Sequence, residues 1–189
     1  MILQILKSIL FLFCFGTLFL SAQKTTLNID NSSIKWTGKE ITTKTHYGSL
    51  KFKSGNVIFK DGLIIEGKFI VDMTSLLDED LQGNYKEKLE NHLKSDDFFS
   101  VEKFNESSLT ILSSSKISNG LKASGILTIK GISHPIEFSM LKDNNSWLST
   151  LTFDRSKYNV RFRSGSFFKN LGDKLILNSI DIESVLNFN

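Results

Sequence analysis

LIIEGKFIV, residues 63–71, alternates apolar and polar side chains with the two-residue period of a β-strand. The apolar members, which share one face on this period, are Leu63, Ile65, Gly67, Phe69 and Val71. Charged Glu66 and Lys68 lie on the other face. The stretch therefore predicts a strand with one buried and one solvated face.

The same pattern recurs on both sides of this stretch. Residues 50–59 are interpreted as two short strands around the turn Ser54-Gly55-Asn56, with Leu50, Phe52, Val57 and Phe59 as apolar members. Further alternating runs are 120–130, 136–140, 147–153 and 180–188. Turn signals between the runs are Asp61-Gly62, Asn119-Gly120 and Gly172-Asp173.

One region departs from alternation. Tyr85, Leu89, His92 and Leu93 follow the spacing of an apolar helical stripe, with charged residues on the other face. We expect one amphipathic helix at about 80–94 and a turn of helix at 74–78. Many strands with one helix favour an all-β sandwich or a closed antiparallel barrel of about eight strands, which can hold one ligand.

Composition excludes several classes of protein. A length of 189 residues suggests one domain, and 40% hydrophobic residues exclude a disordered chain. Cys14 is the single cysteine, so neither an intramolecular disulfide nor a multi-cysteine metal site can form. A net charge of +3 is too weak for a nucleic-acid-binding protein, unless the basic residues cluster.

Residues 1–22 are expected to be a signal peptide. Lys7 precedes the apolar run 8–20, and Ser21-Ala22 offers a small residue for cleavage after Ala22. A retained anchor is the alternative, whereas Phe13 before Cys14 disfavours a lipoprotein signal. The domain would then span 23–189 and reside in the periplasm or outside the cell.

Several stretches together resemble the YceI-like proteins, which are secreted bacterial polyisoprenoid-binding proteins. They are His46-Tyr47-Gly48, the run 67–73 (GKFIVDM), the helix exit 89–99 (LENHLKSDDFF), residues 125–135 (GILTIKGISHP) and residues 154–160 (DRSKYNV). The resemblance implies an extended, lipocalin-like antiparallel β-barrel with a long apolar cavity for a polyprenyl chain. Phe104-Asn105 and His134 depart from the family pattern without affecting the expected fold.

Large apolar side chains of inward parity are the candidate cavity lining. These residues are Trp36, Phe52, Phe59, Phe69, Phe138, Tyr158, Val160 and Phe162. Each can bury a large apolar area against a lipid tail, although the same property suits a packed core. Parity alone does not distinguish a cavity wall from a filled interior.

Residues 155–163 read as a strand with a basic outer face and an apolar inner face. The outer face would carry Arg155, Lys157, Arg161 and Arg163. Arg155 is the candidate for a phosphate-bearing head group or an anionic membrane, because arginine binds phosphate bidentately. A solvated strand face is the alternative for the set.

The histidines are His46, in a glycine-flanked turn, His92, on the apolar side of the helix, and His134. None has the spacing of a metal pair, so no metal or other cofactor is expected, and His46 and His92 are candidate head-group contacts. Asp78, Glu79 and Asp80 would favour a helix N-terminus, and Asp96-Asp97 a turn or cap. No catalytic motif is present.

These observations predict a secreted binding protein, not an enzyme, that carries or stores an isoprenoid-type lipid such as a polyprenyl chain or isoprenoid quinone. Transient contact with a membrane surface and a homodimer are both compatible with this function. Two alternatives stay open at this point. One is a barrel enzyme acting on a small apolar substrate, and the other is a stress or structural protein with a filled core.

Overall fold

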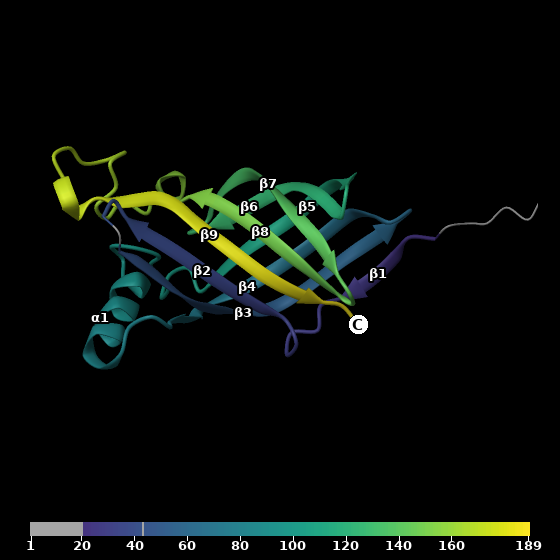
Figure 1. The fold of residues 1–189 in the computed structure, drawn as a ribbon, viewed down its shortest axis with the longest axis horizontal. Helices are drawn as coiled ribbons and strands as arrows, with labels where there is room; N and C mark the ends of the chain where they lie inside the picture. Colours follow the sequence, from purple (N-terminus) through teal and green to yellow (C-terminus); the bar gives the residue numbers. More distant parts are fainter. Residues whose placement is uncertain (1–20, 43) are drawn as a thin grey trace, which may run out of the picture.

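The computed structural model describes residues 21–42 and 44–189 (Figure 1). The described residues form nine strands and one α-helix. The strands are β1 (Gln23–Thr26), β2 (Ser33–Glu40), β3 (Thr45–Lys60), β4 (Leu63–Asp78), β5 (Glu106–Ile117), β6 (Gly120–Ile129), β7 (Ile132–Asp143), β8 (Ser146–Asp154) and β9 (Ile176–Asn187). Helix α1 spans Gly83–Lys94, and two 3-10 turns, Arg155–Tyr158 and Gly172–Lys174, precede β9. All but the last two residues of the expected signal peptide lie outside the described residues.

The strands form one closed antiparallel barrel. Their order is β1-β3-β2-β9-β8-β7-β6-β5-β4, and pairing of β3 with β4 closes the sheet. Strands β2 to β9 make the eight-stranded wall, while β1 pairs with the second half of β3 beside β2. Closure pairs the sheet edges that a sandwich would leave open. The expected antiparallel barrel of about eight strands is confirmed.

Alternation predicted the inward face correctly where a strand is regular. In β6 the odd-numbered residues from Leu121 to Ile129 are buried. The inward residues Phe138 and Met140 of β7 and Phe153 of β8 are buried as well. These residues face the interior because every second side chain of a half-buried strand points inward.

The predictions fail where a strand carries a β-bulge. Residues 50–59 are not two strands around a turn but part of the continuous strand β3, whose register against β4 shifts between Phe52 and Ser54. In β4 the register shifts again, so that Ile64 is fully buried and Ile65 is 42% exposed. A bulge inserts one residue into a strand, so the side chains beyond it that point inward change from odd to even positions or the reverse. In the sequence, this break in alternation looks like a turn between two strands.

The helix is shorter than expected. Residues 74–78 are not a turn of helix but the end of β4, and α1 begins at Gly83. Leu93, near the end of α1, is buried, whereas Tyr85 at the start of the expected stripe is 76% exposed. Only the last two turns therefore pack on the barrel. Among the described residues, no helix has the length and apolarity needed to cross a membrane.

The expected strand at 155–163 is also wrong. Residues Arg155–Tyr158 form a 3-10 turn, whose start is capped by the Asp154 carboxylate accepting from the Ser156 N–H. Asn159 follows with a left-handed φ of 58°, which ends the turn. The chain then runs without a strand to β9 through turns, in which the Ser164 N–H donates to the Arg161 carbonyl and the Phe168 N–H to the Ser164 carbonyl.

Candidate functional site

Two hydrophobic clusters occupy the barrel interior, and a cavity of about 430 Å³ lies between them. One cluster lies beneath α1 and includes Phe98 and Leu93, and the other lies toward the β3–β4 hairpin and includes Ile64. Several apolar residues pack against both clusters and are only partly buried because they face the cavity. They are Leu50, Val71, Leu109, Leu151 and Ile182. The volume is within the range of small-molecule sites.

Five of the eight predicted lining residues face this cavity. They are Trp36, Phe52, Phe69, Phe138 and Phe162. Trp36 is anchored by its indole N–H, which donates to the Leu77 carbonyl at 3.0 Å. The interior is therefore not completely filled by side chains.

The other three predicted lining residues lie away from the cavity. Phe59 stacks on Trp147, with 6.0 Å between ring centroids, and meets Phe188 edge-on. Tyr158, the last residue of the 3-10 turn, and Val160 are buried, and the Tyr158 ring packs against Phe153. The alternating pattern correctly predicted that these side chains point inward. It does not distinguish the packed parts of the interior from the cavity.

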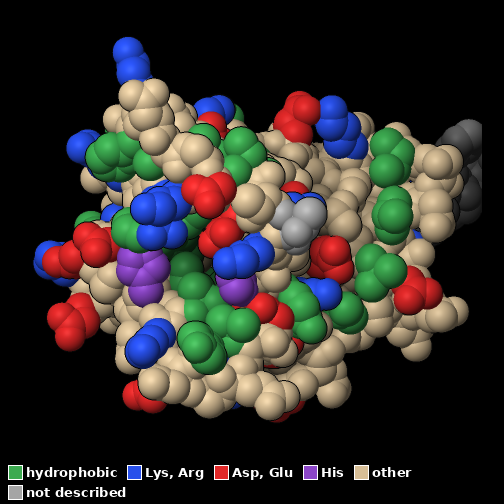
Figure 2. Space-filling model, turned by 60° about the vertical axis from the view of Figure 1, so that its left-hand side comes forward, with side chains coloured by type: hydrophobic (Ala, Val, Ile, Leu, Met, Phe, Trp, Pro, Cys, Tyr) green, Lys and Arg blue, Asp and Glu red, His purple; other side chains and the backbone are tan. Residues whose placement is uncertain are grey.

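The cavity opens at the α1 end of the barrel through a rim that we call the mouth. Its polar residues are Lys39, Glu40, His46, Lys88, His92 and Arg163. Figure 2 shows this face as a hollow floored by hydrophobic side chains, with histidine, lysine and arginine side chains around it. Lys39 pairs with Asp181 at 3.6 Å and His46 lies against Asp80, which leaves the Lys88 and Arg163 cations to meet an anionic group at the mouth.

Lys39 and Lys88 were not predicted as site residues. Lys88 lies on the charged face of α1, which the periodicity assigns to solvent, and Lys39 lies at the end of β2. No signal in the sequence places either residue at the mouth, because that depends on how α1 docks against the barrel. Arg163, read as part of a strand face, instead stands at the mouth with its guanidinium 5.1 Å from the Phe162 ring centroid.

The two predicted head-group histidines both line the cavity, on different elements. His92 comes from α1, and its ring lies 4.3 Å from that of Phe162, centroid to centroid. Its Nε2 atom is buried without a hydrogen-bond partner. Burial lowers the pKa of His92, and the nearby Arg163 adds to that effect against the opposing charge of Asp97. His92 therefore presents a neutral imidazole at neutral pH.

His46 is the second residue of β3, not part of a turn, and its Nδ1 lies 2.9 Å from Asp80 Oδ2. Asp78 and Asp80 do not begin a helix, since Asp78 ends β4 and α1 starts after Gln82. Asp78 is fully buried. Burial raises the pKa of the Asp78 carboxyl, and the adjacent Asp80 raises it further.

The third predicted head-group residue, Arg155, lies outside the cavity and is fully buried. Its guanidinium donates to three backbone carbonyls, those of Leu177, Val160 and Ile176, at 3.0–3.1 Å. Burial lowers the pKa of Arg155 to about 10, so the group stays charged at neutral pH. The geometry indicates that Arg155 holds the 159–177 segment onto the barrel.

These features define the chemistry that the site can perform. The deep part of the cavity offers aliphatic and aromatic surface, which binds an apolar chain through the hydrophobic effect. The mouth offers cationic groups and a neutral imidazole, which can bind a polar or anionic group at one end of that chain. The site therefore suits an amphiphile with a long apolar part.

Comparison with known families and structures agrees with this architecture. The YceI-like domain family model matches residues 26–188. The crystal structure of Burkholderia cenocepacia BcnA is similar, with a TM-score of 0.64 and 17% identity over 85% of this chain and 98% of that one. A polyisoprenoid binding domain from Saccharophagus degradans, implicated in plant cell wall breakdown, has a TM-score of 0.55 at 11% identity over 87% and 97% of the two chains. No curated protein matches the chain.

Proposed function

The chain belongs to the YceI-like domain family, and we propose from this premise that it binds one isoprenoid-type lipid in its barrel. The observation that carries the proposal is the cavity of about 430 Å³, whose deep part is apolar and whose mouth carries Lys88 and Arg163. The binding function of the Saccharophagus domain supports the choice of an isoprenoid chain. Affinity would arise from burial of the chain, at about 0.8 kcal/mol for each CH₂-sized group.

The ligand is expected to enter tail first, with its polar end at the mouth. A head group there would meet Lys88, His92 and Arg163, which line the open end of the cavity. The unpartnered Nε2 atom of His92 supports this orientation, because a ligand atom would satisfy it. The function is carriage or storage of the lipid, without a chemical step.

We further propose that the mouth makes transient contact with a membrane surface. The segment 161–175, which we call the rim loop, exposes Phe167 and Phe168 at 42% and 49%. The Arg161 guanidinium lies 5.0 Å from the Phe167 ring centroid, and Lys169 and Lys174 are exposed nearby in the chain. Exposed aromatic residues beside cations suit the interface of an anionic bilayer, from which a lipid carrier must collect its ligand.

The expected compartment is the periplasm or the exterior, reached through the signal peptide proposed for residues 1–22. Binding in that compartment would carry the lipid between membrane surfaces across water. Cleavage after Ala22 would leave the domain 23–189, which contains every mouth residue and every residue of the rim loop.

A titration with a matched pair of variants tests the binding proposal. The protein is freed of co-purified lipid by solvent extraction and titrated with an isoprenoid quinone and a prenyl phosphate. Leu109→Trp should abolish binding because Leu109 lines the cavity. Leu112→Trp is the control, because Leu112 lies on the same strand and is 58% exposed. Equal binding by both variants, or none by the unmodified protein, would contradict the proposal.

Membrane contact has its own test. The unmodified protein should sediment with anionic phosphatidylglycerol vesicles and less with neutral phosphatidylcholine vesicles. The Phe167→Ser and Phe168→Ser double variant should lose at least tenfold in vesicle affinity. Tyr85→Ser is the control because Tyr85, although 76% exposed, lies at the start of α1 outside the rim loop. Undiminished sedimentation of the double variant would contradict a docking role for the rim loop.

A further inference from the structure

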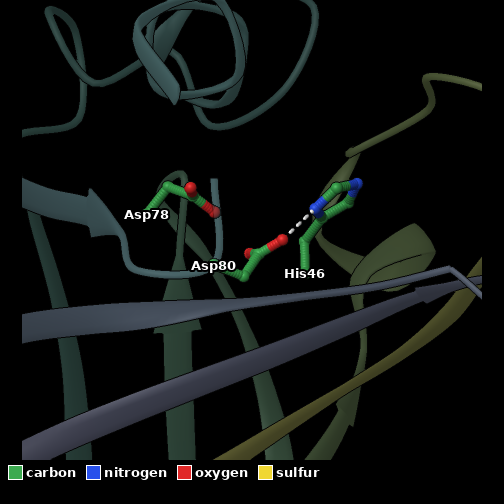
Figure 3. A group of neighbouring side chains, drawn as sticks. All are labelled: His46, Asp78 and Asp80. Carbon is green, nitrogen blue, oxygen red and sulfur yellow. Dashed lines mark hydrogen bonds and ion pairs between the residues drawn. The ribbon is translucent and has the colours of Figure 1, made fainter. Parts of the chain in front are cut away.

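One mouth residue, His46, belongs to a group of titratable side chains that the proposed head-group contacts do not use. The group consists of His46, Asp78 and Asp80, and one potential ligand atom from each lies within 4.8 Å of the other two (Figure 3). His46 comes from the start of β3, Asp78 from the end of β4, and Asp80 from the segment that leads to α1. The β3–β4 pairing thus brings together residues more than 30 positions apart in the sequence.

The two carboxylates are held in the same manner. Asp78 Oδ1 accepts a hydrogen bond from the Leu81 N–H at 2.8 Å, and Asp80 Oδ1 accepts one from the Tyr47 N–H at 2.9 Å. Each carboxylate therefore has one oxygen fixed by a backbone N–H. Of the second oxygens, Asp80 Oδ2 lies 2.9 Å from His46 Nδ1, and Asp78 Oδ2 has no partner. Hydrogen bonds of this kind orient carboxylates that bind metals in proteins.

The second Asp78 oxygen is not satisfied by the chain. Asp78 is fully buried, and its Oδ2 atom has no hydrogen-bond partner. A buried oxygen without a partner is destabilising, so each such atom requires an explanation. Figure 3 shows the Asp78 carboxyl group directed toward Asp80, on the side where His46 lies.

The local charge is also uncompensated. Within residues 21–42 and 44–189, no lysine or arginine forms an ion pair with Asp78 or Asp80, and His46 is the one basic partner. Glu90 Oε1 accepts from the Asp78 N–H at 2.9 Å, but its charge is paired with Lys86 at 3.8 Å. A cation would satisfy the orphan oxygen of Asp78 and offset the charge of the two aspartates.

We propose that His46, Asp78 and Asp80 bind one divalent transition-metal cation of the Zn²⁺ type. One imidazole nitrogen with two carboxylate oxygens is a donor set that suits these ions, whereas Mg²⁺ and Ca²⁺ prefer oxygen alone. Donors in a tetrahedral zinc site lie about 3.4 Å apart. The present spacing, from 2.9 Å between His46 and Asp80 to no more than 4.8 Å, is within small side-chain adjustments of that value.

The position of the site links it to the cavity without making either depend on the other. His46 also lines the cavity, so the ion would lie at the edge of the mouth. Three protein ligands leave a coordination position for water or another small ligand. The proposal goes beyond lipid binding, and metal binding can be measured with no lipid present.

Calorimetric titration with Zn²⁺ tests the site. Chelator-treated protein without a polyhistidine tag should bind Zn²⁺ at a one-to-one ratio and bind Mg²⁺ at least tenfold more weakly. Asp80→Asn and His46→Gln should each weaken Zn²⁺ binding at least tenfold. His134→Gln is the matched control and should leave the affinity unchanged, because His134 contacts the Lys157 carbonyl on another part of the barrel.

Asp78→Asn provides an independent measurement, with circular dichroism confirming that each variant is folded. The metal proposal predicts that added Zn²⁺ raises the melting temperature of the unmodified protein but not that of Asp78→Asn. A proton shared between Asp78 and Asp80 is the rival explanation and predicts no saturable Zn²⁺ binding. That outcome, or one-to-one binding that survives both Asp80→Asn and His46→Gln, would overturn the proposal. Failure of the metal site would leave the lipid proposal unaffected.

Discussion

The two ends of the barrel are built from the same strands but differ in the side chains and connecting segments that they carry. Strand β3 contributes His46 to the mouth and Phe59 to the opposite end. At that opposite end, which we call the closed end, the rings of Phe59, Phe69, Trp147 and Phe188 pack with centroid distances of 6.0–6.4 Å. At the mouth, titratable side chains surround a cavity.

The connections between strands explain this difference. At the closed end β3–β4, β5–β6 and β7–β8 are joined by two-residue turns, which hold neighbouring strands together and leave no segment to form a rim. At the mouth, residues 79–105 and 155–175 form long connections that carry α1 and the rim loop (Figure 1). The strands form the barrel wall, and the long connections determine at which end the cavity opens.

The largest loss of stability is expected on replacing Arg155, the buried cation that holds the segment 159–177 onto the barrel. Arg155→Met should lower the free energy of unfolding by roughly 3–5 kcal/mol, since three backbone carbonyls lose their donor. Chemical denaturation measures this loss. Arg161→Met is the control, because Arg161 is exposed. A variant that stays as stable as the control yet loses lipid binding would instead favour a head-group role for Arg155.

A pair of leucine truncations distinguishes the packed interior from the cavity wall. Leu121→Ala should cost about 3 kcal/mol of unfolding free energy because Leu121 is 2% exposed in the cluster toward the closed end. Leu151→Ala should cost less than about 2 kcal/mol, since that side chain already faces a cavity, but it should alter lipid affinity. Equal losses of stability, measured by urea denaturation, would mean that both positions are packed alike.

The tryptophans report on the two ends separately. Trp36 lines the cavity and Trp147 stacks at the closed end, and the sequence contains no others. Quenching by an isoprenoid quinone should be strong in the Trp147→Phe variant, which retains Trp36. It should be at least threefold weaker in the Trp36→Phe variant, provided that this variant still binds. Equal quenching in the two variants would contradict the location of the cavity.

The smallest effect is a pH dependence confined to the mouth. Burial lowers the pKa of folded His92 below its ordinary value of 6.5, so the unfolded chain takes up a proton first as the pH falls. The contribution of His92 to stability is therefore complete above pH 6.5 and declines below it. Melting temperatures between pH 7.5 and 5 should fall less in His92→Gln than in the unmodified protein. An identical decline in both would show that His92 is not the group responsible.

Sequence patterns predicted the regular parts of the wall. The buried odd-numbered residues of β6 follow directly from alternation, and the YceI-like stretches identified the barrel. The bulges of β3 and β4 were missed because an inserted residue changes the parity without changing the composition. The rim was missed for a different reason. Whether Arg155 meets solvent or backbone carbonyls depends on the path of residues 159–177, which no local pattern encodes.

The assignment of the mouth was partly predictable. Two of the three expected head-group residues, His46 and His92, line the cavity because a β-strand start and a helix end converge there. Lys88 was read as solvent-facing, and the contact between α1 and the barrel turns it into a mouth residue. Five of the eight expected lining residues reach the cavity, and the other three fill packed regions that share its inward parity.

Native mass spectrometry of the protein purified from its own host shows whether the barrel holds a lipid. Lipid binding predicts a second species heavier than the chain by the mass of one isoprenoid-type lipid. Solvent extraction should release this lipid, and adding a prenyl phosphate or isoprenoid quinone should restore a bound species. Detection of the bare chain alone, with no uptake of either compound, would contradict lipid binding in the barrel.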